Sequence, residues 1–439
     1  MLHQSALSPL PDHDPAASGR NKIIVVAIGP VTIKYLDASL APLGLKPVFI
    51  IETGHGYEGA SGEVLNRYEH YEADIFSAES IAKVLREHPH LTRQAMGIYS
   101  FYDSCYPAID GIAKEHGLLA PEPSIVLLSE KDYLYRLIPE YCPNFISFKP
   151  RQLEALDVSS LAQAKGLILK PSLAGGADGT CRLRPGTGLK ASIQEAIHRC
   201  ILSDAWTQTW ILQEGMTGRL MSLEGYAHHG QVYFIGFSLR TRIDMTEMAN
   251  EFPADEYFPE PVREHCRDAV RQTINRAGLR NGYFHCEFIV DPQLQRAYLI
   301  DGNLGRVSGG AAVEQFSRSY GLDPRDVLRH VAMLPLQPDL VPTPFPATPV
   351  VRLKTRAIYF GLDQATTLRG MTFPSGSACD QTQYLGIGQQ VLPVGHSDAS
   401  WIGVISGLQE DVVREIEQIR IQTNEGPRKP VYAIHESAR

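Results

Sequence analysis

The sequence has no excess of positive charge. Its 439 residues include 41 Lys and Arg against 49 Asp and Glu, which gives a formal net charge of −8. Proteins that bind nucleic acid or anionic membranes need a basic surface to neutralise phosphates, so this balance argues against both kinds of partner. A locally basic site for one small phosphorylated ligand remains compatible with it.

Cysteine is scarce and follows no ligand pattern. The seven cysteines are scattered and form no CxxC pair: Cys105, Cys142, Cys181, Cys200, Cys266, Cys286 and Cys379. Neither a zinc site nor a disulfide framework is expected from such spacing. A reducing cytoplasm fits best.

Long apolar runs are also missing. No run reaches the roughly 18 residues of a membrane-spanning helix. Residues 1–20 contain three Pro and two Asp without the apolar centre of a signal peptide, which predicts a disordered tail.

Two nucleotide-binding fingerprints are absent. Gly29-Pro30 follows the first apolar strand, but no GxGxxG motif follows, which argues against a Rossmann cofactor. The Gly-rich stretch 172–180 is not closed by GKS or GKT, so it is not a Walker A loop.

Residues 21–125 are typical of a small doubly wound α/β domain. Apolar, β-branched runs predict strands at 22–28, 46–51 and 95–99, and helices are expected between them at 35–43 and 78–87. Alternation of this kind favours a parallel sheet with helices on both faces.

The most informative stretch is 283–310. An apolar run that contains Glu287 leads to a turn at Asp291-Pro292 and a second run, 297–300, which predicts a β-hairpin. Asp301 and Asn303 follow at the end of the second strand, and their oxygens, with that of Glu287, suit a hard cation such as Mg²⁺. A plain hairpin with solvent-facing acids is the alternative.

Two lysines precede that hairpin. A short strand at 121–129 is expected to lead to a helix capped by Ser129, with Lys131 in its first turn. The helix dipole disfavours a cation there, so Lys131 either binds an anion or is simply exposed to solvent. Lys170 ends a strand at 166–170, and the glycines at 172–180 let backbone N–H groups approach an anion before a strand at 181–183. An ordinary Gly-rich hairpin explains the second pattern equally.

The remaining segments are predicted more coarsely. A strand at 209–213 running into 214–218 can present main-chain groups to an adenine edge or form a hinge. The paired histidines 228–229 are expected on a solvent-exposed turn, with metal ligation as the alternative. Residues 245–261 are expected to form an acidic loop over the site. Helices are predicted at 191–202, 262–277, 311–320, 324–333 and 408–423, a linker at 335–349, strands at 222–227, 231–238, 350–360, 389–393 and 401–406, and turn-rich connections at 361–388.

Taken in order, these elements resemble the ATP-grasp superfamily from about residue 127 to residue 320. The N-terminal domain resembles the pre-ATP-grasp domain, and residues 388–419 are similar to the last domain of the L-amino-acid ligases. The resemblance implies an α/β (α+β) chain with the ATP-grasp fold. Its parts would be a tail at 1–20, a pre-ATP-grasp domain at 21–125, an ATP-grasp domain at 126–335 with lobes 126–215 and 216–335, and a small C-terminal α/β lobe at 336–439 that closes over the site.

The resemblance also implies roles for individual residues. ATP phosphates would be bound by Lys131 and Lys170, with a loop over them that contains Ser172, Gly175, Gly176 and Gly179. Gln213, Glu214 and Met216 would border the adenine, while Glu287, Asp301 and Asn303 would hold Mg²⁺, with Mn²⁺ as a substitute. Arg306, Gly309 and Gly310 would stabilise the reacting carbonyl. Arg240, Arg242 and Glu224 are the candidates for substrate contact, although solvated charges are the alternative for the two arginines.

Three departures from the family pattern stand out. Asp301 replaces the usual Glu, Arg306 is separated from Asn303 by two residues, and Leu220 stands where relatives carry a ribose-binding Glu. The first two leave metal binding intact but weaken the assignment of Arg306.

The implied activity is that of a carboxylate-amine ligase that uses ATP and Mg²⁺ and proceeds through an acyl phosphate. Its substrates would be amino acids or another small carboxylate, and a homodimer is expected. The alternatives are a ligase of the carboxylase or purine-pathway type and a non-catalytic ATP-binding regulatory protein. A biotin-dependent carboxylase is disfavoured, because no Met-Lys-Met biotin carrier motif is present.

Overall fold

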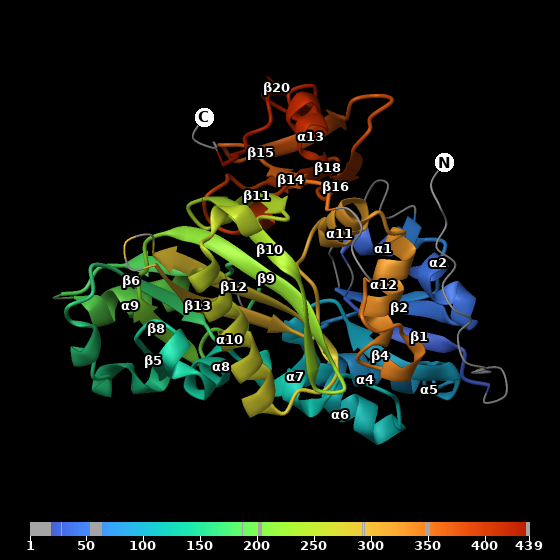
Figure 1. Ribbon diagram of the computed structural model, residues 1–439, viewed down its shortest axis with the longest axis horizontal. Helices are drawn as coiled ribbons and strands as arrows, with labels where there is room; N and C mark the ends of the chain where they lie inside the picture. The colour runs from blue at the N-terminus through green and yellow to red at the C-terminus, as the bar shows by residue number, and fades with distance from the viewer. Residues whose placement is uncertain are drawn as a thin grey trace.

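The structure is a computed structural model that describes residues 19–27, 29–52, 64–186, 188–200, 204–291, 293, 295–346 and 352–435. The expected N-terminal tail therefore lies outside the described residues, apart from its last two. Figure 1 shows the N-terminal domain (blue) at one end, the lobe 126–215 (green) at the other, and the C-terminal lobe (red) above the sheet between them. The described part of the chain contains no helix with the length and apolar character needed to cross a membrane.

The N-terminal domain is a four-stranded parallel sheet in the order β3-β2-β1-β4. Its strands are β1 (Lys22–Val26), β2 (Lys46–Glu52), β3 (His70–Ala73) and β4 (Ala95–Ser100), and its helices include α2 (Leu36–Leu40), α4 (Ala78–Glu87) and α6 (Tyr106–His116). The predicted α/β class and the expected strands are confirmed. β3 was not predicted, because its sequence HYEA is partly exposed and has no apolar run.

The strand predicted at 121–129 is wrong. Residues Pro123–Leu128 form the helix α7, with Pro123 at its first position and with Ile125 and Leu128 buried on one face. The next helix is α8 (Lys131–Leu137). Ser129 does not cap it, because its hydroxyl donates instead to the carbonyl of Val126.

The second sheet belongs to the lobe 126–215 and is antiparallel, in the order β5-β8-β6-β7. It consists of β5 (Phe145–Phe148), β6 (Leu167–Pro171), β7 (Cys181–Leu183) and β8 (Trp210–Glu214), as the sequence predicted for the last three. The helix α9 (Leu189–Arg199) covers one face through Ile193 and Ile197, which share a core with Leu169 and Trp210. On the other face, Ile168, Lys170 and Gln213 line a cavity.

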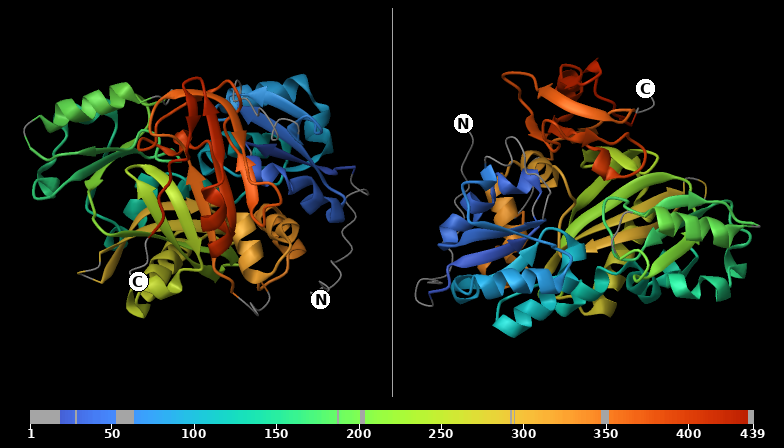
Figure 2. Two further views of the ribbon diagram at one scale, coloured as in Figure 1. Left: turned by 90° about the horizontal axis from the view of Figure 1, so that it is seen from above. Right: turned by 180° about the vertical axis from the view of Figure 1, so that it is seen from behind.

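The central sheet has eight strands in the order β13-β12-β9-β10-β11-β14-β18-β16. Its bounds are β9 (Arg219–His228), β10 (Gln231–Ile243), β11 (Thr246–Phe252), β12 (Gly282–Asp291), β13 (Arg296–Leu304), β14 (Thr355–Phe360), β16 (Asp380–Gln383) and β18 (Gly403–Leu408). The sheet crosses the expected boundary at 335–336, so the C-terminal lobe is joined to the central lobe by strand pairing. The rear view in Figure 2 shows the C-terminal lobe (red) next to the central lobe.

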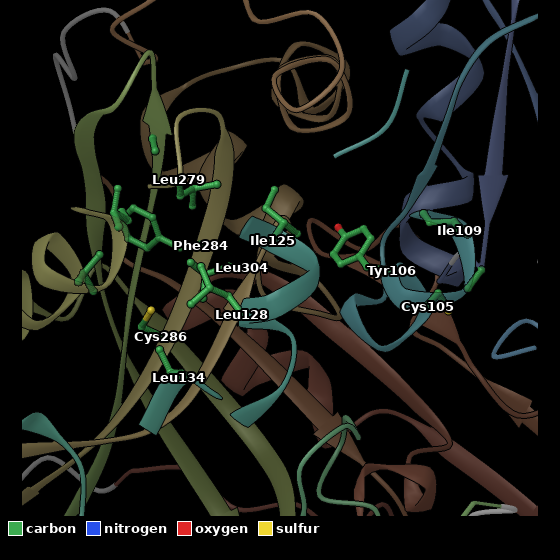
Figure 3. Packing of buried hydrophobic residues seen from close by; sticks show 14 of the residues in the cluster. Cys105, Tyr106, Ile109, Ile125, Leu128, Leu134, Leu279, Phe284, Cys286 and Leu304 are labelled. Atoms are coloured by element: carbon green, nitrogen blue, oxygen red, sulfur yellow. The ribbon is translucent and has the colours of Figure 1, made fainter. Parts of the chain in front are cut away.

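The hairpin β12–β13 packs on helices from the preceding domain. Figure 3 shows Ile125 and Leu128 facing Leu304, with Leu134 next to Cys286. These residues belong to one buried cluster that also contains the helix α10 (Glu260–Ala277). The predicted hairpin is confirmed, and its anchoring on α7 and α8 brings Lys131 towards it.

The acidic loop predicted at 245–261 is wrong in its first half. Residues 246–252 form β11, which is buried throughout between β10 and β14. Burial of its acids is tolerated because Glu247 binds Arg240 and Glu251 binds Arg356. Because the buried positions of β11 include charged residues, its sequence lacks the apolar pattern from which a buried strand is predicted.

The C-terminal region differs from the prediction in three places. The helices α11 (Ala312–Tyr320) and α12 (Pro324–Met333) are confirmed, but the following linker packs on them through the buried residues Leu336, Val341 and Phe345. The expected connection 361–388 contains β15 (Thr366–Thr372) and β16. The last helix, α13 (Gln409–Ile416), ends early, and its expected continuation is β19 (Arg420–Thr423), paired with β15 and β20 (Gly426–Arg428).

Candidate active site

A cavity of about 560 Å³ lies between the second sheet and the central sheet. Its walls come from α8, β6, β8, β10, β12 and β13, which are far apart in the sequence. The predicted residues that line it are Lys131, Lys170, Gln213, Met216, Arg240, Arg242, Glu287 and Asp301. Those that do not line it are Ser172, Gly175, Gly176, Gly179, Glu214, Glu224, Asn303, Arg306, Gly309 and Gly310.

The two lysines lie on one side of this cavity. Lys131 Nζ donates to the carbonyl of Ala174 at 2.6 Å and lies 3.4 Å from Asp301 Oδ1. Lys170 Nζ donates to the carbonyl of Ile300 at 2.5 Å and to the Tyr135 hydroxyl at 3.0 Å. The pKa of Lys170 is lowered to about 8, chiefly by burial; Asp301 opposes this shift and Lys131 contributes to it.

The Gly-rich loop 172–180 is fixed at its base. Ser172 accepts the backbone N–H of Asp132 and donates its hydroxyl to the Asp132 carboxylate at 2.7 Å, so it joins the loop to α8. Gly179 has a φ of +68°, and a Cβ added there would lie 2.9 Å from Cys200 Sγ. Gly176 also has a positive φ, of +58°. Glycine is favoured at both positions, because other residues rarely adopt a positive φ.

β8 ends at Glu214, and the residues 216–218 that follow it line the cavity. Gln213 is buried, and its side-chain oxygen accepts the Tyr135 hydroxyl at 2.8 Å. Glu214 turns away from the cavity and pairs with Asn144. Met216 lines the cavity together with Leu220, Ile168 and Ile289, which gives this end an apolar wall suited to a flat aromatic ring.

The carboxylates stand on paired strands. Glu287 on β12 lies opposite Asp301 on β13, and His285 lies opposite Asn303. The expectation that Asp301 and Asn303 follow the strand is wrong, because β13 continues to Leu304. Placement within the ladder holds both side chains on the same face as Glu287.

Glu287 is surrounded by cations. Arg240 binds one of its oxygens, and Arg242 lies 3.3 Å from the other. Burial by itself would raise the pKa of Glu287, but Arg240 and Arg242 hold it well below its usual range. Glu287 is therefore an ionised carboxylate on the cavity wall.

A buried network supports this carboxylate, and sequence reasoning missed most of it. Arg240 is only 9% exposed and also binds Glu247, so the solvated-charge alternative is wrong for Arg240. His285 lies 3.2 Å from Glu287 and 2.5 Å from Glu224. Burial by itself would lower the pKa of His285, but the carboxylates of Glu224 and Glu287 together raise it. Glu224 thus contacts His285 and does not reach the cavity.

The residues present fit a divalent cation that also binds phosphate. Asp301 Oδ1 is buried and has no hydrogen-bond donor among the described residues, although Lys131 is within ion-pair distance. The described ranges contain no group of three His, Cys, Asp or Glu side chains that could hold a metal alone. Mg²⁺ typically takes one or two protein carboxylates and completes its shell with phosphate oxygens and water, which matches Glu287 and Asp301.

Arg306 contacts Asn303 and does not line the cavity. Its Nη2 donates to Asn303 Oδ1 at 2.7 Å and its Nε donates to Asp103 at 3.1 Å. Burial lowers the pKa of Arg306, but Asp103 more than offsets this and keeps the guanidinium charged. Asp103 was missed, and its only sequence signal is its place just after the strand at 95–99.

Gly309 and Gly310 follow at the start of α11. Gly310 has a φ of +64°, and an added Cβ would lie 2.2 Å from the Tyr359 hydroxyl. Nothing lies within 4 Å of a Cβ added at Gly309. A side chain is therefore excluded at Gly310, by the positive φ and by Tyr359, whereas there is space for one at Gly309.

Comparison with known proteins identifies the fold. The sequence matches no family model and no curated protein. The structure is similar to an L-amino acid ligase from Bacillus licheniformis, with a TM-score of 0.68, 15% identity, and coverage of 94% of this chain and 99% of that one. It is similar to the biotin carboxylase domain of a Hydrogenobacter thermophilus 2-oxoglutarate carboxylase dimer in complex with MgADP and bicarbonate, with a TM-score of 0.64, 14% identity, and coverage of 92% and 91%.

A third similar structure is a carboxyaminoimidazole ribonucleotide synthase from Aspergillus clavatus, complexed with ATP. Its TM-score is 0.64 at 12% identity, with coverage of 90% of this chain and 95% of that one. The chain has the ATP-grasp fold. Similarity at this level of identity shows the ATP-grasp fold and leaves the substrates open.

Proposed function

We propose that this ATP-grasp protein is a ligase that joins a carboxylate to an amine, with ATP converted to ADP and phosphate. The observation that carries the proposal is the cavity itself. Lys131, Lys170, Glu287 and Asp301 all line it, with Lys131 3.4 Å from Asp301, and Met216 lines it together with the apolar residues Ile168 and Leu220. Binding a triphosphate needs the cations, and activating its terminal phosphoryl group needs the carboxylates for a metal.

In the first step, the substrate carboxylate attacks the γ-phosphorus of ATP, and an acyl phosphate forms as ADP leaves. Lys131 and Lys170 would neutralise charge on the transferring phosphoryl group. Glu287 and Asp301, with Asn303 next to them, would hold Mg²⁺ or Mn²⁺, which when bound supplies positive charge to the phosphate oxygens.

In the second step, the amine nitrogen attacks the acyl carbon, the C–O bond to phosphate breaks and the amine loses a proton. Arg306 would stabilise the negative charge on the carbonyl oxygen, since Asp103 and Asn303 hold its guanidinium in place. The Gly-rich loop would exclude water from the acyl phosphate. The sequence predicts that 245–261 covers the site as a loop, but its first half is the buried strand β11.

The substrates are inferred from the similar structures and from the C-terminal lobe. We favour amino acids, because residues 388–419 resemble the last domain of the L-amino-acid ligases in sequence, and the similar L-amino acid ligase structure matches over nearly all of both chains. The carboxylase structure, in complex with MgADP, and the ribonucleotide synthase structure, complexed with ATP, support ligases of the carboxylase type and of the purine-pathway type as alternatives. A homodimer is part of the proposal, and the carboxylase neighbour is a dimer.

The test is ADP and phosphate release with pairs of amino acids, compared with bicarbonate and with single substrates. Release that depends on both a carboxylate and an amine supports the proposal, whereas AMP and pyrophosphate as products would contradict it. Turnover with bicarbonate alone would favour the carboxylase type.

Asp301→Asn separates an enzyme from a regulatory protein with the same fold. The amide keeps the shape of the side chain but loses the charge that a cation needs, so we expect turnover to fall by about 100-fold or more. Asp363→Asn, at an exposed position of the C-terminal lobe, is the matched control. Unchanged turnover in Asp301→Asn would exclude the proposed role of this carboxylate.

A further inference from the structure

A short segment of the C-terminal lobe contacts the Gly-rich loop. Residues 395–398, which we term the latch segment, lie between that loop and the hairpin β10–β11. The backbone N–H of Asp398 donates to the carbonyl of Gly176 at 3.0 Å, in the middle of the loop. A Cβ added at Gly176 would lie 3.5 Å from the Asp398 Cβ, so the two backbones are in close contact.

The latch segment is itself fixed to the central sheet. The Thr246 hydroxyl donates to the carbonyl of Ser397 at 2.8 Å and accepts the N–H of Gly395 at 2.8 Å. The N–H of Met245 donates to the carbonyl of Gly395 at 3.1 Å. One side of the segment is therefore held by the end of β10–β11, and the other side meets the loop.

The Asp398 side chain completes this bridge. Its Oδ1 accepts the backbone N–H of Glu247 at 2.8 Å, at the start of β11. Burial raises the pKa of Asp398 to about 7, while Arg242 and Arg240 oppose this shift. The same residue thus contacts the sheet through its carboxylate and the Gly-rich loop through its N–H.

The loop that Asp398 contacts forms part of the cavity wall. Ala174, Ala177, Asp178 and Thr180 line the cavity, and Lys131 donates to the carbonyl of Ala174. Gly176 lies among these residues, so a bond to its carbonyl fixes the loop where the phosphates of a nucleotide would lie.

We propose that Asp398 is a positioning residue that holds the Gly-rich loop closed over the cavity, so that the C-terminal lobe controls access of water to the reacting phosphates. The proposed effect of Asp398 on catalysis rests on the proposed ligase function. The proposed effect of Asp398 on the loop rests only on the contacts described above. The contact joins two lobes, because Asp398 belongs to the C-terminal lobe and Gly176 to the lobe 126–215.

The experiment uses the full chain and two readouts. Asp398→Ala removes the acceptor for the Glu247 N–H, Asp398→Asn keeps an oxygen there, and His396→Ala changes an exposed neighbour in the same segment. In hydrogen exchange without nucleotide, we expect the amides of residues 172–180 to exchange about fivefold faster in Asp398→Ala, the loss typical of one hydrogen bond. Asp398→Asn and His396→Ala should resemble the original protein.

The second readout is ATP hydrolysis in the absence of the amine. We expect Asp398→Ala to raise this uncoupled hydrolysis relative to ligation by about fivefold, with Asp398→Asn restoring the coupling. A protein that is no ligase shows no ligation in any variant, and the exchange result still decides whether Asp398 holds the loop.

Unchanged exchange at residues 172–180 in a folded Asp398→Ala variant overturns the proposal. If that variant does not fold, Thr246→Val serves in its place, because it removes the hydroxyl that anchors the latch segment and keeps the side-chain shape. Faster loop exchange in Thr246→Val supports the proposal, and unchanged exchange overturns it.

Discussion

Lys170 should make nucleotide binding weaken as the pH rises through about 8. Its ammonium is buried beside Lys131, and burial lowers its pKa from 10.5 to about 8 in the protein without ligand. Phosphate oxygens attract the ammonium form and gain nothing from the neutral amine. The sign is therefore fixed, because raising the pH removes a charge that the ligand needs.

The magnitude follows from the shift. At about one pH unit above the pKa, roughly one molecule in ten keeps the proton, so the Kd for ATP should rise about tenfold between about pH 7 and pH 9. Binding should also take up about half a proton at pH 8, since the bound phosphates restore the charge. Calorimetry in buffers of different ionisation enthalpy measures both quantities.

Lys170→Arg is the matched variant for this experiment. Arginine stays charged over the whole range, so its binding should be nearly independent of pH, even if weaker because the guanidinium fits the Tyr135 and Ile300 acceptors differently. A flat profile for the original protein, or the same slope in Lys170→Arg, would refute the reasoning.

Two further predictions concern Gly310 and Asp103, which do not line the cavity. Gly310→Ala should lower the free energy of unfolding by about 1–3 kcal/mol, because its φ is positive and the added Cβ would lie 2.2 Å from a tyrosine hydroxyl, whereas Gly309→Ala should stay within about 0.5 kcal/mol in denaturant titrations. Asp103→Asn should reduce kcat about tenfold with little change in the KM for ATP, since it loosens Arg306 and leaves the lysines in place, and Asp110→Asn on the surface of α6 is its control. An equal loss in both Asp variants would show that the Asp103–Arg306 pair has no role in the reaction.

The sequence predicted helices and strands correctly where apolar periodicity and turn residues indicate the same element. The hairpin β12–β13, the strand that ends near Lys170 and the helices α4 and α12 form as predicted, because each buries one face that is visible in the sequence. The prediction failed at β11, whose seven residues are buried although two are Glu. It failed again at 408–423, where the alternation of buried and exposed residues in β19 was taken as part of a helix.

By itself, the sequence determined which residues can carry charge, donate oxygen ligands or allow tight backbone turns, and the strands on which several of them lie. The tertiary structure alone decided which of them meet. Arg240 beside Glu287, Asp103 beside Arg306 and Asp398 against Gly176 join residues from different lobes or strands. The physical reason is that such contacts depend on sheet order and domain packing, which leave no periodic signal near either partner.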